Sequence, residues 1–534
     1  MSFIINSLNV TSTTLELQGT LIGSLVSDRL RSYADSAASA LNGSLDGPSV
    51  PSYVDALLFL ENYKEWWLRL VRDDPVHVVV ETVLLFTILV VIWRGNGSKK
   101  AKNFDSKLTF SEKEQLIKDW KSTSLTPPLT DQEKRIVLRN NEQVTTYTGT
   151  HIQTTASSSL LLNLSTFDFL CMSVSEDVKR ASRETLQTYG CGSCGPRGFY
   201  GTIKPHLTLE EEFAAVWGVN ESIMYSDGAS TSSSTVAAFA KRGDLLVIDQ
   251  GIYEGLLTGV TLSRSNVKTF KHNDMDDLRE VLEKIRREDK RLSRNVLEQR
   301  RFIVTEAIYR NYGSILPLDK LVALKDEFCF RLIVDESLSF GVLGPNGLGI
   351  TDLYNLPNSI EITTVSLENA LGSVGGMTIG DDEVVDHQRL SGAGYVFSAS
   401  APPFVSSASV ASLGVIKKDG KEMIKKLKKN ATTVVNIIKK IKQLSLTSSP
   451  DSPVIFCCLS SSASHESQNL TLQSIASECK SNGVLLVATG DHVTDHLLIH
   501  SPPPMLRLTV NVLHTESMLK KAGVVIQKAC EKFC

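Results

Sequence analysis

The sequence lacks the features that would mark a nucleic-acid-binding protein or a secreted, disulfide-bonded one. Its 56 lysines and arginines are offset by 59 acidic residues, giving a net charge of −3, and only 7% of its residues are aromatic. Nucleic-acid binding needs a basic surface and is therefore not expected. Nine cysteines in 534 residues are too few for a disulfide framework and favour a reducing compartment. The neutral first ten residues do not begin a secretory signal peptide.

Long apolar runs are also scarce, and the one present lies at 76–93 and reads VHVVVETVLLFTILVVIW. A bilayer span needs roughly 20 mainly apolar residues. His77 and Glu81 interrupt this run, so a buried core helix is the alternative. Trp93, Arg94 and a basic linker follow, which favours a single transmembrane helix over 76–94. More positive charges follow the run than precede it, which predicts a cytosolic C-terminal body.

Two segments precede the apolar run. Residues 1–52 are rich in Ser, Thr, Asn and Gly and are predicted to form a polar flexible leader. Residues 53–75 show a helical apolar period, with Trp66 and Trp67 beside basic residues. This pattern predicts an amphipathic helix at a membrane interface, and an ordinary helix packed on the body is the alternative.

The rest of the chain has the pattern of an α/β protein. A linker and N-terminal arm at 95–180 lead into a large domain at 181–404, where short β-type runs alternate with helical segments. This alternation predicts a mostly parallel sheet covered on both faces. Residues 405–534 predict a smaller α+β C-terminal domain. The β-type runs lie at 221–226, 244–249, 267–270, 301–306, 330–336 and 362–367.

A glycine-rich stretch, YGCGSCGPRGFYG, occupies 189–201. It contains G-x-G-x-x-G, but a helical run precedes it and Pro196 follows, so a dinucleotide site is not expected. Cys191 and Cys194 form C-x-x-C without a second ligand pair or a redox context, so neither a metal site nor a redox site is predicted. The stretch is interpreted as a loop of the kind that often lines a ligand site.

Two further positions suggest a ligand site. Asp335 ends a strongly apolar strand, and ligands of open α/β sheets bind outside the carboxyl ends of strands. The alternative is that the acid caps the next helix together with Ser337. Ser398 lies in a hydroxyl-rich loop ahead of a helix, where it would meet a phosphate or serve only as a turn residue.

Taken in order, the motifs CGPRGFYG, FKHNDM, DESLSFGVLG, DHQRLSG and FSASAPP resemble the α-oxoamine synthase family over roughly residues 105–515. These are fold-type I, aspartate aminotransferase-like enzymes that use pyridoxal phosphate (PLP) to join an amino acid to an acyl-CoA. Within the family the chain is most similar to the first long-chain-base subunits of serine palmitoyltransferases. The resemblance implies the fold-type I architecture, with a mostly parallel central sheet and a smaller C-terminal domain.

The resemblance also identifies what is missing. Catalytic members carry T-K-S-F-G-x-x-G-G, whereas this chain reads E-N-A-L-G-S-V-G-G and places Asn369 at the Schiff-base lysine position. An amide cannot form that Schiff base. Leu338 and Tyr253 stand at two histidine positions, and only Asp335 is retained, as a vestigial cofactor ligand. No catalytic residue is therefore predicted on this chain.

The resemblance further implies a heterodimer with a second, lysine-bearing long-chain-base subunit. That partner would bind PLP and condense L-serine with palmitoyl-CoA into 3-ketosphinganine. Cys194 and Ser398 are predicted to reach across the interface toward the partner's PLP. Arg507 matches the position that binds the substrate carboxylate in relatives, and a structural ion pair is the alternative. Small activating subunits, Orm-type regulators and the endoplasmic reticulum membrane are also implied.

Two other functions remain open from the sequence. One is a self-sufficient PLP-dependent α-oxoamine synthase that uses another lysine, but Lys320 and Lys325 lie on a predicted helix between strands. The other is a membrane scaffold without a catalytic partner.

Overall fold

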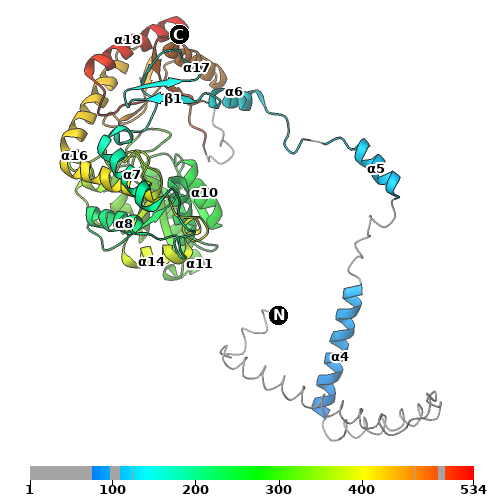
Figure 1. Cartoon of the computed structure of the whole chain (residues 1–534). Coiled ribbons are helices and arrows are strands. Elements are labelled where there is room, and N and C mark those ends of the chain that lie inside the picture. Colours follow the sequence, from blue (N-terminus) through cyan, green and yellow to red (C-terminus); the bar gives the residue numbers. More distant parts are fainter. Residues whose placement is uncertain (1–71, 73–74, 97–108, 123, 462, 491–499) are drawn as a thin grey trace. The chain divides into compact units, whose positions relative to one another are not determined.

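The computed structural model describes residues 72, 75–96, 109–122, 124–461, 463–490 and 500–534 (Figure 1). The chain divides into two compact units, Met1–Leu125 and Thr126–Cys534, which are described separately. The leader expected at 1–52 and nearly all of the interfacial helix expected at 53–75 lie outside the described residues.

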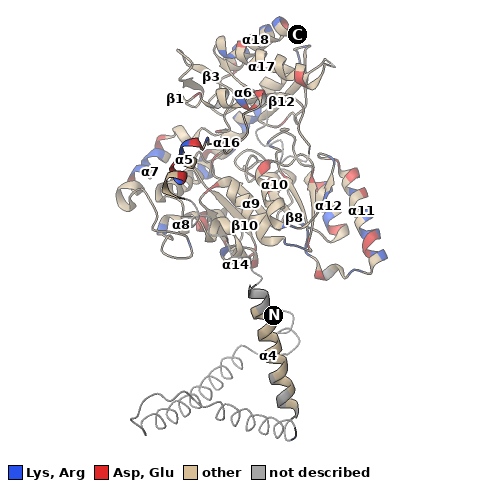
Figure 2. Ribbon diagram, turned by 90° about the vertical axis from the view of Figure 1, so that its right-hand side faces the viewer, with Lys and Arg blue, Asp and Glu red and all other residues tan. Residues whose placement is uncertain are grey.

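The first unit contains α4 (Pro75–Asn96), a helix at the position of the long apolar run, and α5 (Phe110–Asp119). Large apolar side chains along α4 are exposed, among them Phe86 at 67% and Leu89 at 62%. The sequence of this helix also contains the charged residues Glu81 and Arg94, and Figure 2 shows its described side chains as uncharged. Across the described residues, no helix combines the length and the apolar character that crossing a bilayer requires. The transmembrane helix expected over 76–94 is not confirmed.

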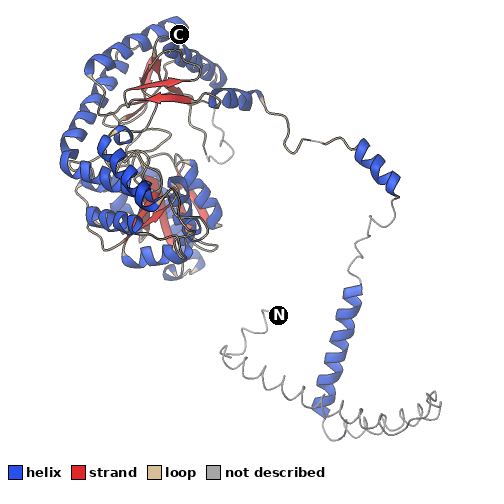
Figure 3. Ribbon diagram, in the orientation of Figure 1, coloured by secondary structure: helices blue, strands red, loops and turns tan. Residues whose placement is uncertain are grey.

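A seven-stranded sheet forms the centre of the second unit, in the order β4-β10-β9-β8-β7-β5-β6 (Figure 3). Each predicted β-type run contains one strand of this sheet, and the neighbours from β9 through β6 pair in parallel. The mostly parallel sheet is therefore confirmed. Its strands are β4 (Ser222–Tyr225), β5 (Leu245–Asp249), β6 (Asn266–Phe270), β7 (Arg301–Glu306), β8 (Arg331–Asp335), β9 (Ile362–Ser366) and β10 (Gly376–Gly380).

The seventh strand, β10, was not predicted. It runs antiparallel to both β4 and β9 and so joins the edge strand to the parallel part of the sheet. Its sequence, GMTIG, begins and ends in glycine, and glycine is disfavoured in strands. Pairing with a strand on each side overrides that propensity, because all five residues are buried.

Helices cover both faces of the sheet. On α11 the buried residues Leu278, Leu282 and Ile285 follow a helical period, and Asp274 caps its first turn by accepting two backbone N–H bonds. Figure 2 shows charges of both signs along this helix. The helices before the last domain are α6 (Asp131–Asn140), α7 (Glu176–Tyr189), α8 (Lys204–Trp217), α9 (Gly228–Phe239), α10 (Glu254–Ser263), α11 (Met275–Leu292), α12 (Leu318–Phe328), α13 (Ile350–Tyr354), α14 (Asp382–Ser391) and α15 (Ala393–Val396), with short 3₁₀ turns at Met172–Val174 and Val296–Glu298.

The C-terminal part forms a smaller α+β layer that the N-terminal arm completes. One sheet has the order β11-β12-β15-β14, and a second has β1-β2-β3-β13, in which β3 of the arm pairs in parallel with β13. The long helix α16 (Pro403–Ile438) leads from the large sheet to this layer (Figure 1). The other elements are β1 (Val144–Tyr147), β2 (His151–Thr154), β3 (Leu161–Asn163), β11 (Leu444–Leu446), β12 (Val454–Leu459), α17 (His465–Ser481), β13 (Val484–Leu485), β14 (Val487–Ala488), β15 (Leu506–Thr509) and α18 (Glu516–Phe533).

Candidate functional site

Three carboxylates meet at the carboxyl edge of the central sheet. Asp249, Glu306 and Asp335 end the strands β5, β7 and β8, which are consecutive and parallel. Their exposed fractions are 0%, 2% and 3%. This edge is where open α/β sheets bind ligands, so the strand order brings the three acids to the place expected for a functional site.

Hydroxyl groups of the chain itself surround the Asp335 carboxylate. Its Oδ2 accepts hydrogen bonds from Ser232 Oγ at 2.6 Å, Thr364 Oγ1 at 2.9 Å and the Tyr253 phenol at 3.2 Å. Its Oδ1 accepts from the backbone N–H of Ser337 at 2.9 Å. An ionised carboxylate offers about four acceptor sites. The internal donors therefore occupy the positions that a ligand nitrogen would need.

Tyr253 is held against Asp335 by its own backbone. It lies at the start of α10, is 7% exposed, and its N–H donates to Glu306 Oε1 at 2.8 Å. A Cβ added at Gly255 would lie 2.5 Å from the Tyr253 ring, so the glycine lets the ring pack on the helix start. Burial, with a further contribution from the Asp335 charge, raises the pKa of Tyr253 well above its usual value. The phenol therefore keeps its proton and acts as the donor.

Glu306 is the third buried acid of this cluster. Burial, and then the charge of Asp335, raise the pKa of Glu306 well above its usual value. Its two oxygens accept the N–H groups of Tyr253 and Arg310 at 2.8 Å and 2.9 Å. Glu306 thus fixes the backbone that places Tyr253. Glu306 was not predicted from the sequence. Its position as the last residue of the strand-like run RFIVTE could have identified it as a site residue.

Asn369 and Leu338 are built into the body of the protein. Asn369 is 5% exposed, and its Nδ2 donates to the backbone oxygen of Ser337 at 2.8 Å. Leu338 is 3% exposed within the hydrophobic core. The loop after Asn369 turns tightly at Gly372 (φ 60°), where a Cβ would lie 2.4 Å from the Ser173 N–H nitrogen. The amide at 369 is therefore an ordered internal donor.

The residues of this cleft do not fit a PLP group held by this chain. Position 369 has no amine, and Asp335 is satisfied internally, as described above. The first turn of α9 would attract a phosphate, but Asp227 caps it by accepting the Ser230 N–H at 2.7 Å. A phosphate there would meet a carboxylate. Among the described residues, no group of three His, Cys, Asp or Glu side chains is arranged to hold a metal ion.

The structure joins the loops that carry Cys194 and Ser398. Ser193 Oγ donates to the Ser400 carbonyl at 2.7 Å, and Ser400 Oγ donates to the Gly195 carbonyl at 2.9 Å. Cys194 is exposed and is therefore not part of the core. Ser398 Oγ lies 3.2 Å from Ser226 Oγ, just beyond the end of β4. Both residues thus belong to one composite surface.

This loop pair is rigidly attached to the sheet. Arg197 pairs with Glu210 at 2.9 Å, with the two side chains 5% and 10% exposed, and Arg197 Nη1 also donates to the Met224 carbonyl at 3.4 Å. A Cβ on Gly201 would lie 1.8 Å from the Gly195 oxygen, so only glycine permits the two ends of the loop to touch. Close packing therefore explains Gly201 alone. At Gly190, Gly192 and Gly195, the glycines that resembled a dinucleotide motif, a Cβ would meet nothing within 4 Å.

Large aromatic side chains protrude from the same two loops. Phe199, Tyr200 and Phe397 are 73%, 87% and 85% exposed. Buried anchors of protein interfaces are enriched in aromatic residues, and exposed apolar patches mark such interfaces. The loop pair thus has the properties of a docking surface.

Arg507 and His272 have no hydrogen bond to Asp335. Arg507 Nη2 donates to the Ser165 carbonyl at 3.0 Å, and its guanidinium lies 4.4 Å from the Phe167 ring centre. His272, from the FKHNDM motif, lies 2.9 Å from Asp249 Oδ1 and 2.7 Å from Ser314 Oγ. The histidine therefore links the ends of β5 and β7, a role that the sequence did not reveal.

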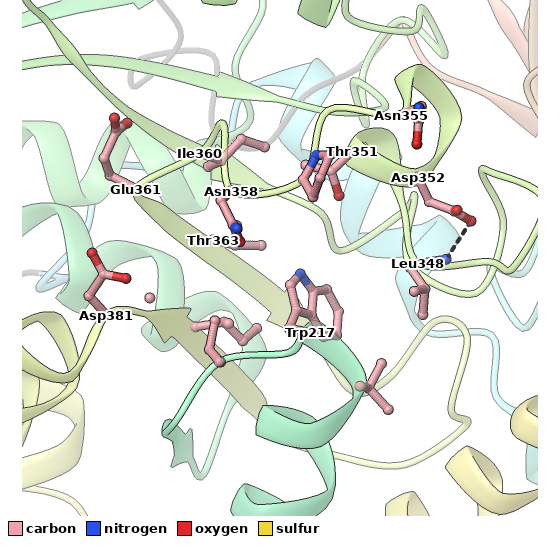
Figure 4. Close-up of a pocket in the computed structure, with 15 residues that line it drawn as sticks. Trp217, Leu348, Thr351, Asp352, Asn355, Asn358, Ile360, Glu361, Thr363 and Asp381 are labelled. Carbon is pink, nitrogen blue, oxygen red and sulfur yellow. Dashed lines mark hydrogen bonds between the residues drawn. The ribbon is translucent and has the colours of Figure 1, made fainter.

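A cavity of about 400 Å³ lies at the other edge of the sheet (Figure 4). Trp217, Asp352, Glu361 and Asp381 line it, and Glu361 immediately precedes β9. Lys325 pairs with this Glu361 at 2.6 Å. The buried lysine that was considered as an alternative for PLP thus lies at the amino edge of the sheet, away from Asp335.

Comparison with known proteins defines the class. A family model described as aminotransferase class I and II matches residues 159–526. A serine palmitoyltransferase from S. paucimobilis, solved with a bound PLP–myriocin aldimine, has the same fold with a TM-score of 0.66. It is 22% identical over 75% of this chain and 96% of that chain. An 8-amino-7-oxononanoate synthase from Francisella tularensis has a similar fold, with a TM-score of 0.57. It is 22% identical over 70% of this chain and 98% of that chain. The chain belongs to the aminotransferase class I and II family and has its PLP-transferase fold.

Curated relatives narrow this assignment. The long chain base biosynthesis protein 1 of Arabidopsis thaliana is 38% identical over 455 residues, which cover 85% of this chain and 91% of that protein. The serine palmitoyltransferase 1 of Dictyostelium discoideum is 37% identical, over 80% of this chain and 88% of that protein. The serine palmitoyltransferase 1 of Saccharomyces cerevisiae is 34% identical over 67% of this chain and 66% of that protein. Within its family, the chain therefore belongs with the first subunits of serine palmitoyltransferases.

Proposed function

We propose that this chain is a non-catalytic but required subunit of serine palmitoyltransferase. The observation that carries the proposal is the filled cleft: Asn369 donates to the Ser337 carbonyl, and the Tyr253 phenol donates to Asp335. Neither a Schiff-base amine nor a free carboxylate is left for the cofactor. The sequence retains the family fold, which is expected of a subunit kept for its partner's reaction.

A second, lysine-bearing long-chain-base subunit would bind PLP and complete the active site. That subunit would condense L-serine with palmitoyl-CoA into 3-ketosphinganine, the first step of sphingolipid biosynthesis. The loop pair supports this arrangement, because its exposed Phe199, Tyr200 and Phe397 need a protein surface to cover them. In such a dimer, Cys194 and the Ser398 hydroxyl would face the partner's PLP. The hydroxyl donates to the Gly394 carbonyl in the isolated chain and would turn from it to donate to a phosphate oxygen.

We further propose attachment to the endoplasmic reticulum membrane through α4. The exposed apolar side chains of this helix would be stabilised in a lipid environment. The sequence prediction of a cytosolic C-terminal body is tested by protease protection in sealed microsomes. Small activating subunits and Orm-type regulators would associate near this segment, and copurification with the tagged chain tests their presence.

Borohydride reduction followed by peptide mapping tests the central proposal. The chain is purified alone and together with the subunits that copurify with it, reduced in the presence of PLP, and digested. We expect the labelled lysine on the partner only, together with serine-dependent release of CoA. A label on Lys325 or any other lysine of this chain would instead support a self-sufficient synthase. Absence of label and of activity in every assembly would support a membrane scaffold.

A further inference from the structure

A groove of about 680 Å³ runs beside the middle of α16, away from the three carboxylates of the cleft. Its walls come from the loop after β8, the end of α13, α16, and the loop that precedes β12. Most of the lining is apolar. These apolar side chains include Ile315, Val342, Leu343, Leu353, Ile424 and Leu427.

A second cavity extends the groove along the same helix. It measures about 240 Å³ and shares Lys421 with the first. Its apolar lining includes Phe340, Leu413 and Ile416. The two cavities follow one another along α16 and have Lys421 in common. Their apolar lining, named the channel, suits an extended chain better than a compact ligand.

Lysines form one rim of this channel. Lys417, Lys421, Lys425 and Lys428 line it and recur every three or four residues, so they lie on one face of α16. At 1.5 Å per residue this row is about 16 Å long. A row of ammonium groups therefore follows the channel along α16.

The middle of this row is not neutralised. Lys417 pairs with Glu212 at 2.5 Å, and Lys428 pairs with Asp451 at 3.2 Å. Neither Lys421 nor Lys425 has a carboxylate within ion-pair distance in the described part of the chain. Two uncompensated ammonium groups thus lie beside the deepest apolar lining, Ile424 and Leu427, which are 9% and 2% exposed.

We propose that this groove binds a long-chain fatty acid, with the acyl chain along Ile424 and Leu427 and the carboxylate between Lys421 and Lys425. Apolar walls bind the chain by removing it from water, and the unpaired ammonium groups bind the anionic head. A neutral ligand would leave the lysines unused, and a nucleic acid would leave the apolar walls unfilled. The proposal does not depend on the function proposed above.

Photocrosslinking tests this site in the intact assembly. The full chain is purified with its copurifying subunits into nanodiscs of neutral lipid and labelled with a diazirine analogue of palmitate. We expect labelled peptides from 421–431 or 449–453, and competition by palmitate but not by hexadecanol. The K421E/K425E variant is expected to lose at least about fivefold of this labelling, since each lost ammonium–carboxylate hydrogen bond weakens binding.

The control variant K439E/K440E changes two exposed lysines just beyond the end of α16 and outside the groove, and it should label as the native chain does. Thermal unfolding of both variants verifies that they fold. Equal labelling of K421E/K425E, equal competition by hexadecanol, or labelling confined to other peptides would overturn the proposal. Labelling that appears only when phosphatidylserine is added would assign the lysine row to a membrane surface instead.

Discussion

The phenolic hydroxyl of Tyr253 donates a hydrogen bond to Asp335 Oδ2 at 3.2 Å, inside a site where both residues are buried. The resemblance described above implies that this carboxylate would pair with a cofactor ring in catalytic relatives, whereas in this chain the carboxylate accepts from a side chain of the same protein. The contact converts a ligand-binding acid into part of the core. A buried carboxylate needs such donors, because an unpaired buried charge is strongly destabilising.

Restoring the missing lysine alone should not restore cofactor binding. In N369K the Asp335 carboxylate keeps its bonds to Ser232, Thr364 and Tyr253, and the new amine is buried without a partner. We expect no borohydride-stable PLP label on N369K. The triple variant N369K/Y253H/L338H also removes the tyrosine donor from Asp335 and is expected to take more label than N369K. A strong label on the single variant would contradict the filled-cleft interpretation.

A bulky residue at Cys194 should impair the reaction of the assembled enzyme. The side chain is exposed on a loop held by Ser193, Gly195 and Ser400, so C194W is expected to fold. Its indole would displace the facing groups, and turnover should fall roughly 10- to 100-fold, as small misplacements at an active site do. The comparison is C534W, at another exposed cysteine. Unchanged turnover of C194W would show that the loop does not reach the partner's site.

A charge on the protruding aromatic surface should weaken association with the partner. Phe397 is 85% exposed in the isolated chain, so F397D should not lower the stability of that chain. At an interface anchor it should raise the dissociation constant roughly 10- to 100-fold. Sedimentation of the purified pair measures this change. F533D, at the far end of the chain, provides the control, and equal dissociation constants for the two variants would place the interface elsewhere.

Glu336 should make the stability of the body depend on pH. Burial raises the pKa of this carboxyl from 4.5 to about 7, although it accepts the Ile350 N–H at 3.0 Å and the Ser339 hydroxyl. The folded state therefore binds more protons than the unfolded state between pH 4.5 and 7. The contribution of the Glu336 carboxyl to the free energy of unfolding is at its maximum below pH 4.5. It falls by roughly 3 kcal/mol as the pH rises to about 7.

The variant E336Q removes this titration. Its melting temperature should depend less on pH between 5 and 7 than that of the native protein, since an amide keeps one acceptor oxygen and carries no charge. Thermal unfolding at several pH values measures the difference. E422Q, which changes an exposed acid, should follow the native curve. A native curve that rises with pH over this window would contradict the assignment.

Periodicity was sufficient to predict most of the large sheet. Runs such as DLLVID and FRLIVDE are apolar throughout, as parallel strands buried on both faces must be. Strand β10 was missed because it is short and bounded by glycines, which are disfavoured in strands. Although β9 directly precedes it, its other partner, β4, lies far away in the sequence. The pairing of β3 with β13 was missed for the same reason.

The amino-acid sequence alone determined that position 369 carries an amide, which cannot act as an amine in any fold. It also placed Asp335 and Tyr253 at matching family positions. Only the tertiary structure decided that those two side chains bond to each other, that Ser232 and Thr364 join them, and that the Cys194 and Ser398 loops form one surface. These contacts join residues up to 207 positions apart. Strand order and backbone close approach set such distances, and no local pattern encodes either of them.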